Sequence, residues 1–245
     1  HSNEYKRLKS VLLYLPTYSG VYNVKSTKDA LFEEQPDFDK VVEEVYAYKE
    51  LLESLGIKVY TFENLYDPNA IYAKDLIIAG KNKIVVCNPK HDIRKPEKRN
   101  LVHALPHLAE VPISTHGDPT AYFEGADFFW LNENEAVLNC GDRSSEKAIR
   151  FLEDTFEIKI HKTEVGKEYR IPQHLLGAVN IVNSNTVAIR PELAKNVFEQ
   201  FGYTNRIEFE ETDEIKKGYS MNIVSLSETE LVMPAGNPET KKKFE

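Results

Sequence analysis

One pattern recurs along the sequence: two short apolar runs joined by a polar tip, with successive tips about 50 residues apart. The alternation within the runs and the residues at the tips predict β-hairpins. The four tips lie at residues 81–82, 132–134, 183–185 and 228–229. Because one such unit is too small to bury its own apolar face, the units must pack around a common centre. The repeat therefore predicts a single domain over residues 1–245.

Helices and further strands complete the repeated unit. Apolar side chains at helical spacing over residues 37–55 predict an amphipathic helix that ends at Gly56. The other expected helices are 95–105, 145–156 and 191–201, and the other expected strands are 10–16, 57–62, 157–165 and 206–211. The unit strand–strand–helix–strand is used about five times, which predicts an α/β fold whose units close into a ring with the strand starts toward the axis.

The last residues of the sequence and one pair of histidines bear on the predicted helices. Asn237 and Pro238 have the residue types of a helix start, so we expect residues after Glu245 to complete the last unit. His103 and His107 are four residues apart, a metal-like spacing. Pro106 between them argues against a continuous helix, so we expect both histidines to lie at the surface.

Charge and cysteine content exclude several classes of function. A net charge of −8 argues against nucleic acid as the main partner, because phosphate binding requires a basic face. No apolar run approaches the ~20 residues that cross a bilayer, so no membrane partner is expected. Cys87 and Cys140 are too few for a disulfide framework or a metal cluster. A reducing, cytoplasmic location is therefore the expectation.

Polar residues recur at the starts of the hairpins. They are Asp75, Glu124 with Asp127, His174 and Asn222. Each one alone is explained if its side chain satisfies a backbone donor at a strand edge. Their recurrence at one phase of the repeat favours a second interpretation, in which they face one axial cavity. One histidine and three carboxylates in a single cavity are an inventory typical of an active site.

The residue types in this cavity indicate the ligand. Several carboxylates with one imidazole make a poor transition-metal site, and we expect neither a metal nor a cofactor. A guanidinium presents five N–H donors that pair with carboxylates two at a time. Such a cation would also relieve the mutual repulsion of Asp75, Glu124 and Asp127. We therefore expect a small cationic guanidino substrate.

Five segments resemble, in the right order, motifs of the guanidino-group-modifying enzymes. They are residues 72–75 (YAKD), 123–127 (FEGAD), 139–145 (NCGDRSS), 174–182 (HLLGAVNIV) and 221–226 (MNIVSL). The superfamily includes arginine deiminase, dimethylarginine dimethylaminohydrolase and the amidinotransferases. The resemblance covers most of the chain. It implies the pentein fold, a five-bladed α/β propeller of repeated ββαβ units, with the last unit incomplete in this sequence.

The resemblance implies a role for each matching residue. Asp75 would hold the substrate guanidinium, and Glu124 with His174 would form the acid–base pair. Asp127 would contribute to substrate binding or hold the site together. Arg143 would pair with the α-carboxylate of the substrate. The alternative for Arg143 is a solvated residue beside a helix N-cap at Ser144 or Ser145.

The resemblance also implies a cysteine nucleophile that neither cysteine of this chain provides. In the superfamily a thiolate attacks the guanidinium carbon and forms a covalent thiouronium, which water then hydrolyses. The matching cysteine follows the helix and strand of the last unit, which places it beyond Glu245. Cys87 and Cys140 lie at another phase of the repeat, so we expect both to be buried small hydrophobes.

A departure from the motifs bears on the substrate. Leu176 stands where arginine deiminases and amidinotransferases carry an Asp, which dimethylarginine hydrolases also lack. One carboxylate fewer leaves room for an N-substituted group. We therefore expect a hydrolase that acts on a guanidino C–N bond of arginine or an N-substituted arginine. Amidinotransfer and a non-catalytic, ligand-binding pentein are the alternatives, and a homodimer is one option for the assembly.

Overall fold

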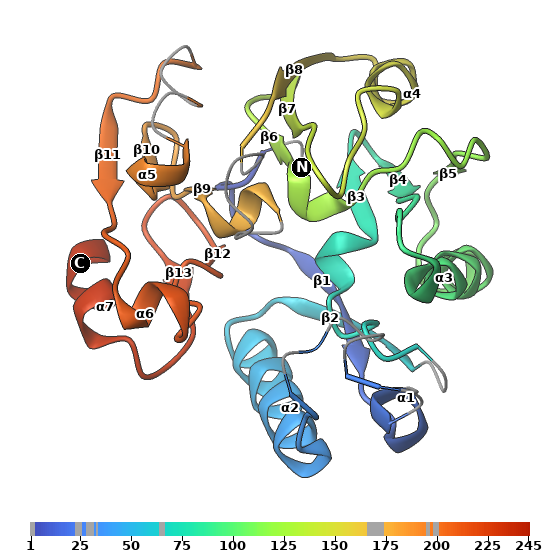
Figure 1. Cartoon of the computed structure of the whole chain (residues 1–245), viewed down its shortest axis with the longest axis horizontal. Coiled ribbons are helices and arrows are strands. Elements are labelled where there is room, and N and C mark those ends of the chain that lie inside the picture. The colour runs from blue at the N-terminus through green and yellow to red at the C-terminus, as the bar shows by residue number, and fades with distance from the viewer. Residues whose placement is uncertain are drawn as a thin grey trace.

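The computed structural model describes residues 3–22, 26–27, 32, 34–63, 67–165, 174–194, 197 and 201–245. Its strands form five small sheets arranged around the middle of the molecule (Figure 1). Helices lie toward the periphery, among them α2 (Phe38–Ser54), α3 (Lys95–Leu108), α4 (Ala148–Phe156) and α7 (Pro238–Phe244). The predicted α/β class is confirmed. Within the described residues, no helix has the length and apolar character needed to cross a membrane.

The first sheet consists of two parallel strands, β1 (Ser10–Leu15) and β2 (Lys58–Glu63). The short helix α1 (Tyr18–Tyr22) and the long helix α2 lie between these strands in the sequence. The carboxylate of Asp37 caps α2 by accepting a hydrogen bond from the Lys40 N–H at 3.2 Å. Gly56, with φ +75°, adopts the left-handed conformation that ends it. The expected helix over 37–55 is confirmed.

The next three sheets share one topology, a hairpin followed by a helix and a third strand parallel to the second. Their elements are β3 (Ile77–Gly80), β4 (Lys83–Val86), α3 and β5 (Ile113–Thr115); β6 (Phe128–Trp130), β7 (Glu135–Asn139), α4 and β8 (Lys159–Thr163); and β9 (Val179–Ile181), β10 (Thr186–Ile189), α5 (Pro191–Ala194) and β11 (Asn205–Glu208). The predicted repeat is therefore confirmed over these three units.

The last sheet holds the hairpin of β12 (Val224–Ser225) and β13 (Leu231–Val232). Helix α6 (Asp213–Lys216) precedes it and α7 follows it. All four predicted hairpins are thus present, and the helix expected to begin near Asn237 is α7. The fifth unit has the same hairpin-then-helix order as the three units before it.

The expectation drawn from Pro106 was wrong. Helix α3 continues through this residue to Leu108. A proline near the C-terminal end removes only one intrahelical hydrogen bond. The burial of Leu101 and Leu105 in the apolar cluster between the β1–β2 sheet and the β3–β4–β5 sheet outweighs that loss. His103 and His107 are both exposed on this helix, so their expected surface position is confirmed.

Two other helices differ from their expected bounds. Helix α4 begins at Ala148 and not at 145, because Ala148 and Ile149 donate to the carbonyls of Ser145 and Glu146 in tighter turns. Helix α5 is described only for Pro191–Ala194. Residues 195–196 and 198–200, which the prediction also included, lie outside the described residues.

Apolar clusters fill the spaces between neighbouring sheets. Trp130 of β6 packs on the β3 hairpin, where its Nε1 donates to the Ala79 carbonyl at 3.0 Å. A further cluster joins the last sheet to the first: Leu226 packs with Leu52 of α2, and the Leu8 N–H donates to the Leu226 carbonyl at 2.8 Å. The packing therefore links the first and last units as well as consecutive ones.

Candidate active site

Three short 3₁₀ turns carry most of the predicted site residues. They are η1 (Ala73–Asp75), η3 (Gly125–Asp127) and η4 (Leu175–Gly177), and each directly precedes the first strand of a hairpin. Glu124 and His174 are the residues immediately before η3 and η4. The turn η3 contacts both η1 and η4. The repeat thus brings polar residues from three units to one place, as the sequence predicts.

Gly125 allows η1 and η3 to approach this closely. A Cβ atom at this position would lie 2.3 Å from the Lys74 carbonyl oxygen and 2.8 Å from that of Ile77. Real side chains do not tolerate such distances to backbone atoms, so only glycine fits here. The close approach of Asp75 to Glu124 therefore requires the glycine of the FEGAD segment.

Glu124 is fully buried and pairs with His174, which is partly buried. His174 Nε2 lies 2.8 Å from Glu124 Oε2, and the Glu124 side chain has no exposed surface. Burial by itself would raise the pKa of Glu124, but the hydrogen bond from His174 and the charge of Arg94 outweigh it and leave this pKa lowered. Burial would lower the pKa of His174, but the Glu124 bond and the charge of Asp75 outweigh it and leave it raised. The pair therefore favours carboxylate and imidazolium, the charges of an acid–base couple.

Arg94 is a site residue that the sequence interpretation missed. It belongs to η2 (Asp92–Arg94), ahead of α3, and its Nη1 lies 2.6 Å from Asp75 Oδ2 and 3.2 Å from Glu124 Oε2. On its other side, Glu97 accepts from Nε and Nη2 at 3.0–3.3 Å. In the sequence Arg94 lies eight residues after the end of β4, whereas Arg143 lies four residues after the end of β7, so the phase of the repeat does not single it out.

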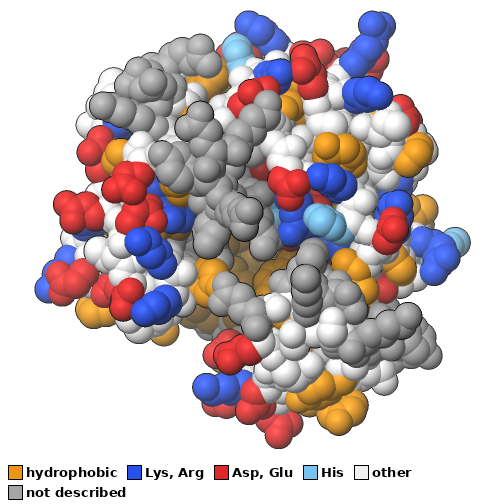
Figure 2. All heavy atoms as spheres, viewed as in Figure 1, with side chains coloured by type: hydrophobic (Ala, Val, Ile, Leu, Met, Phe, Trp, Pro, Cys, Tyr) orange, Lys and Arg blue, Asp and Glu red, His pale blue; other side chains and the backbone are white. Residues whose placement is uncertain are grey.

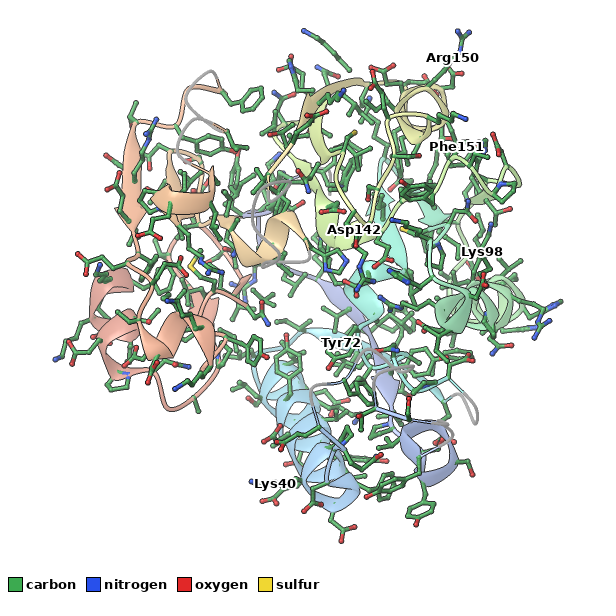
Figure 3. The ribbon with its side chains drawn as sticks, viewed as in Figure 1. Lys40, Tyr72, Lys98, Asp142, Arg150 and Phe151 are labelled. Atoms are coloured by element: carbon green, nitrogen blue, oxygen red, sulfur yellow. The ribbon has the colours of Figure 1, made fainter. Side chains whose placement is uncertain are left out.

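Arg143 is buried, with 4% of its surface exposed. Its Nη1 lies 3.4 Å from Glu124 Oε1, on the side of the carboxylate opposite to His174. This burial contradicts the alternative that Arg143 is a solvated residue beside a helix cap. Its neighbour Asp142 lies above the middle of the molecule in the view of Figure 3, while Tyr72, near Asp75 in the sequence, lies below it.

Asp127 is surrounded by donors of the protein itself. Its carboxylate accepts from Asn139 Nδ2 at 3.1 Å, from Ser144 Oγ at 2.8 Å and from the Leu175 N–H at 2.9 Å. Ser144 Oγ in turn accepts from the Glu124 N–H at 3.1 Å. Burial raises the pKa of Asp127 against these bonds. The arrangement supports the second of its two expected roles, which is to hold the turns of Glu124 and His174 together.

The remaining candidates lie apart from this cluster. Asn222 is exposed, and its N–H donates to the Tyr219 carbonyl at 2.9 Å. Cys87 and Cys140 are buried, as expected. Burial raises the pKa of the Cys87 thiol well above its usual value and that of Cys140 to about 11. Both thiols are therefore protonated at neutral pH and poorly suited to nucleophilic attack.

The cluster has one arrangement that a metal ion could use. One ligand atom each from Asp75, Glu124 and His174 lie within 4.8 Å of one another. However, Arg94 bridges the two carboxylates and His174 is hydrogen-bonded to one of them. The two carboxylates are thus already paired with the Arg94 guanidinium and the His174 imidazole. Two carboxylates and one imidazole are also a poor donor set for transition metals.

Comparison with known proteins identifies the family. The sequence matches the family described as "N,N dimethylarginine dimethylhydrolase, eukaryotic" over residues 23–237, which is most of the chain. The chain belongs to this family. The resemblance to the guanidino-group-modifying superfamily is thereby confirmed. No curated protein matches the sequence significantly.

Solved structures of this superfamily have a similar fold. A mutant of the dimethylarginine hydrolase from Pseudomonas aeruginosa, complexed with citrulline, has a TM-score of 0.78 at 16% identity and covers 97% of this chain and 88% of its own. The N-terminal domain of ArgZ, a cyanobacterial arginine dihydrolase, has a TM-score of 0.80 at 13% identity, with coverages of 97% and 87%. The amidinotransferase SxtG of Microseira wollei has 0.75 at 13%, with 100% and 87%. At such identities the likeness establishes the fold of this dimethylarginine hydrolase family member and not its substrate.

Proposed function

We propose that this protein hydrolyses a guanidino C–N bond of arginine or an N-substituted arginine. The observation that carries the proposal is the Glu124–His174 pair beside Asp75 and Arg143. Family membership supports it, because the family is named for dimethylarginine hydrolysis. The substrate of the Pseudomonas and cyanobacterial relatives belongs to the same chemical class.

The charges of the cluster support a cationic substrate. Four carboxyl groups, those of Asp75, Glu97, Glu124 and Asp127, surround two guanidinium groups and one imidazole. A further guanidinium would complete the pairing of the carboxylates. In this proposal Asp75 accepts hydrogen bonds from the substrate guanidinium. Arg143 attracts the α-carboxylate at the other end of the substrate.

The chemistry requires two steps. A cysteine thiolate, the nucleophile that the resemblance implies, attacks the guanidinium carbon, and the C–N bond to the leaving ammonia or amine breaks. His174 gives the leaving nitrogen its proton and then removes a proton from the water that attacks the thiouronium. Glu124 stabilises the imidazolium that is present before the first step and forms again when His174 takes the proton of water. The products are a ureido amino acid and the amine, with the thiolate regenerated.

Leu176 supports an N-substituted substrate over plain arginine. This residue packs against the apolar cluster of the β9–β10–β11 sheet, and it supplies no carboxylate to the guanidinium. An apolar side chain packs well against an N-alkyl group, but it cannot accept a hydrogen bond from an unsubstituted guanidinium N–H. We therefore propose an N-alkylated arginine as the preferred substrate.

We also propose that the five sheets are the blades of a closed pentein propeller and form one domain. The support is the apolar cluster of Leu226, Leu52 and Ile57, which joins the last unit to the first. If the ring is closed, the three polar turns face its axis. Unfolding of the whole chain in one cooperative transition is the expected behaviour.

The experiment is an assay of the full-length protein with arginine, N-methylarginine and N,N-dimethylarginine. Citrulline together with ammonia, methylamine or dimethylamine is the expected product pair, and His174→Ala is expected to abolish it. Absence of citrulline from all three substrates would overturn the proposal. Because the amidinotransferase SxtG shares the fold, the assay is repeated with an amine acceptor. A new guanidino compound in place of citrulline would favour transfer.

A further inference from the structure

Glu97 is a buried carboxyl group that the proposed reaction does not use. It lies in the first turn of α3, and none of its surface is exposed. Its two oxygens accept from Arg94 Nε at 3.2 and 3.3 Å, and Oε2 also accepts from Arg94 Nη2 at 3.0 Å. A guanidinium bound through two of its nitrogens has a fixed plane. Glu97 therefore determines where the third nitrogen of Arg94 points.

The third nitrogen of Arg94 faces the candidate active site. Arg94 Nη1 lies 2.6 Å from Asp75 Oδ2 and 3.2 Å from Glu124 Oε2. The same oxygen of Glu124 is 2.8 Å from His174 Nε2. Within the part of the chain that the structure describes, the Asp75 carboxylate has no other hydrogen bond or ion pair. The orientation of Asp75 and part of the charge balance at Glu124 thus depend on how Arg94 is held.

Glu97 itself cannot touch a substrate. A hollow opens in the middle of the molecule, and acidic, basic and histidine side chains gather beside it (Figure 2). Glu97 has no exposed surface, and Arg94 exposes only 2% of its own. Any influence of Glu97 on a ligand must therefore pass through Arg94 to the two carboxylates that Arg94 contacts directly.

The other pairing that Arg94 could adopt explains what Glu97 contributes. An arginine binds a carboxylate most strongly through two parallel N–H groups. Without Glu97, a second nitrogen of Arg94 would turn toward Asp75, and both Asp75 oxygens would be occupied. With Glu97 in place, Arg94 contacts Asp75 through Nη1 alone and leaves Oδ1 to accept from another guanidinium.

We propose that Glu97 is a positioning residue, which restrains Arg94 so that Asp75 keeps an acceptor for the substrate guanidinium. This inference rests on the proposed function. The restraint acts on substrate binding, because Asp75 pairs with the substrate before the reaction begins. It acts less on the acid–base step, because Glu124 and His174 contact each other directly at 2.8 Å. Loss of Glu97 therefore raises KM more than it lowers kcat.

The chain contains a matched pair at which the same substitution should have no such effect. Glu211 binds Arg190 in the same two-pronged way, with Nε at 2.7 Å and Nη2 at 2.5 Å. The third nitrogen of Arg190 donates to the Gly177 carbonyl at 2.8 Å and not to a site carboxylate. Glu211→Gln thus weakens an equivalent pair without freeing an arginine beside Asp75.

The experiment compares Glu97→Gln, Glu97→Leu and the control Glu211→Gln in the full-length protein, with N,N-dimethylarginine and arginine as substrates. Loss of one charge-assisted hydrogen bond from Asp75 is expected to raise KM ~10- to 100-fold in Glu97→Leu, with a smaller change in kcat. Glu97→Gln keeps one acceptor oxygen and should raise KM less. Glu211→Gln should leave KM unchanged. If Glu97→Leu does not fold, the isosteric Glu97→Gln carries the comparison.

A second measurement follows Arg94 itself by nuclear magnetic resonance. The side-chain N–H signals of Arg94 in isotope-labelled protein are identified by their absence from Arg94→Lys. Glu97 does not contact Nη1, so the Nη1–H signals report the contact with Asp75. They should shift in both Glu97 variants, because Arg94 turns, and stay in place in Glu211→Gln.

Four results would overturn the inference and leave the proposed function intact. They are an unchanged KM in the Glu97 variants that fold, a fall in kcat that exceeds the rise in KM, a raised KM with unshifted Nη1–H signals, and equal rises of KM in Glu97→Gln and Glu211→Gln. If the wild type turns over neither substrate, the proposed function fails, and calorimetric titration with both compounds tests the inference. Weaker binding by the Glu97 variants supports it, whereas equal affinity or no binding at all overturns it.

Discussion

The third and fourth units each place a buried arginine after the second strand of the hairpin, and the two arginines have different partners. Arg143 follows β7 and contacts Glu124 at 3.4 Å. Arg190 follows β10 and is equally buried, but it forms a two-pronged pair with Glu211 at 2.7 and 2.5 Å and donates to the Gly177 carbonyl. Arg143 comes four residues after the end of β7 and Arg190 directly follows β10, so the two differ in position as well as in the carboxylate that each one meets.

The two carboxylates that pair with these arginines also have different surroundings. Glu124 also binds His174 and Arg94, so its charge is shared within the central cluster. Glu211 is engaged by Arg190, and within the described residues it forms no hydrogen bond or ion pair with the central cluster of Asp75, Glu124 and His174. We infer that Arg143 of the third unit contributes to the chemistry, while Arg190 of the fourth unit contributes to stability. The following predictions test that division.

The largest effect is expected from the two carboxylates. Glu124→Gln removes the charge that stabilises the His174 imidazolium, so kcat should fall ~10²- to 10⁴-fold. Glu211→Gln should leave kcat of the folded protein unchanged and lower its Tm. Steady-state kinetics and thermal unfolding of both variants check this. Equal losses of kcat would break the contrast between the units.

The two arginines should separate in the same way. Arg190→Leu leaves Glu211 without its buried partner and should reduce the free energy of unfolding by about 3–5 kcal/mol. The substrate KM should not change. Arg143→Leu should instead raise KM strongly, because the substrate α-carboxylate loses its partner. Urea unfolding and substrate titration distinguish the two, and a raised KM in Arg190→Leu would contradict the assignment.

Glu97 and Glu211 should give opposite responses to pH. Burial raises the pKa of Glu97 to about 7 despite the opposing bond and charge of Arg94. Between its usual 4.5 and about 7 the folded protein retains a proton that the unfolded chain has lost, so stability falls as pH rises through this window. The full effect is on the order of 3 kcal/mol. Glu97→Gln should remove this slope.

For Glu211 the sign is reversed. The hydrogen bond from Arg190 lowers its pKa, so its contribution is present above 4.5 and is lost as pH falls below that value. Denaturant unfolding from about pH 2.5 to pH 8 measures both slopes. The assignment of Glu97 fails if wild type and Glu97→Gln have the same stability profile between pH 5 and 7.

The smallest effect is expected at Gly125. Gly125→Ala forces the η1 and η3 backbones apart and should cost about 1–3 kcal/mol, with a fall in kcat as Asp75 and Glu124 separate. Gly141→Ala in the same unit is the matched control, since its Cβ would lie 3.3 Å from Asn139 Nδ2 and 3.6 Å from the Val165 carbonyl oxygen, with no closer contact. Thermal unfolding and kinetics of both variants provide the check. A larger effect at Gly141 would contradict this account of the close approach.

The sequence predicted the elements well where a local rule decides them. The four hairpins follow from alternation and turn residues, and helix α2 follows from its apolar spacing, the Asp37 cap and Gly56. The prediction that Pro106 interrupts the helix was wrong. The cost of the lost hydrogen bond depends on how far the proline lies from the helix end and on which side chains the helix buries, and neither is a local property of the sequence.

The candidate site was predicted in part for a similar reason. Asp75, Glu124, Asp127 and His174 stand out because acids and a histidine precede apolar strands at one phase of a repeat. Arg94 and Glu97 did not stand out, because a charged pair in a lysine-rich helix start is indistinguishable from a solvated surface until its burial is known. Their proximity to Asp75 is a property of the folded chain.

The sequence by itself determined the repeated unit, the family and the set of polar residues at the strand starts, because these depend on spacing and residue type along the chain. Only the tertiary structure decided which charges meet. Arg143 and Arg190 both follow the second strand of a hairpin, and the sequence does not reveal what either one binds. The difference between a site residue and a structural ion pair arises from the carboxylate that folding brings to each, Glu124 at 3.4 Å or Glu211 at 2.5 Å. Distances between segments far apart in sequence set electrostatic energies, and no local pattern encodes them.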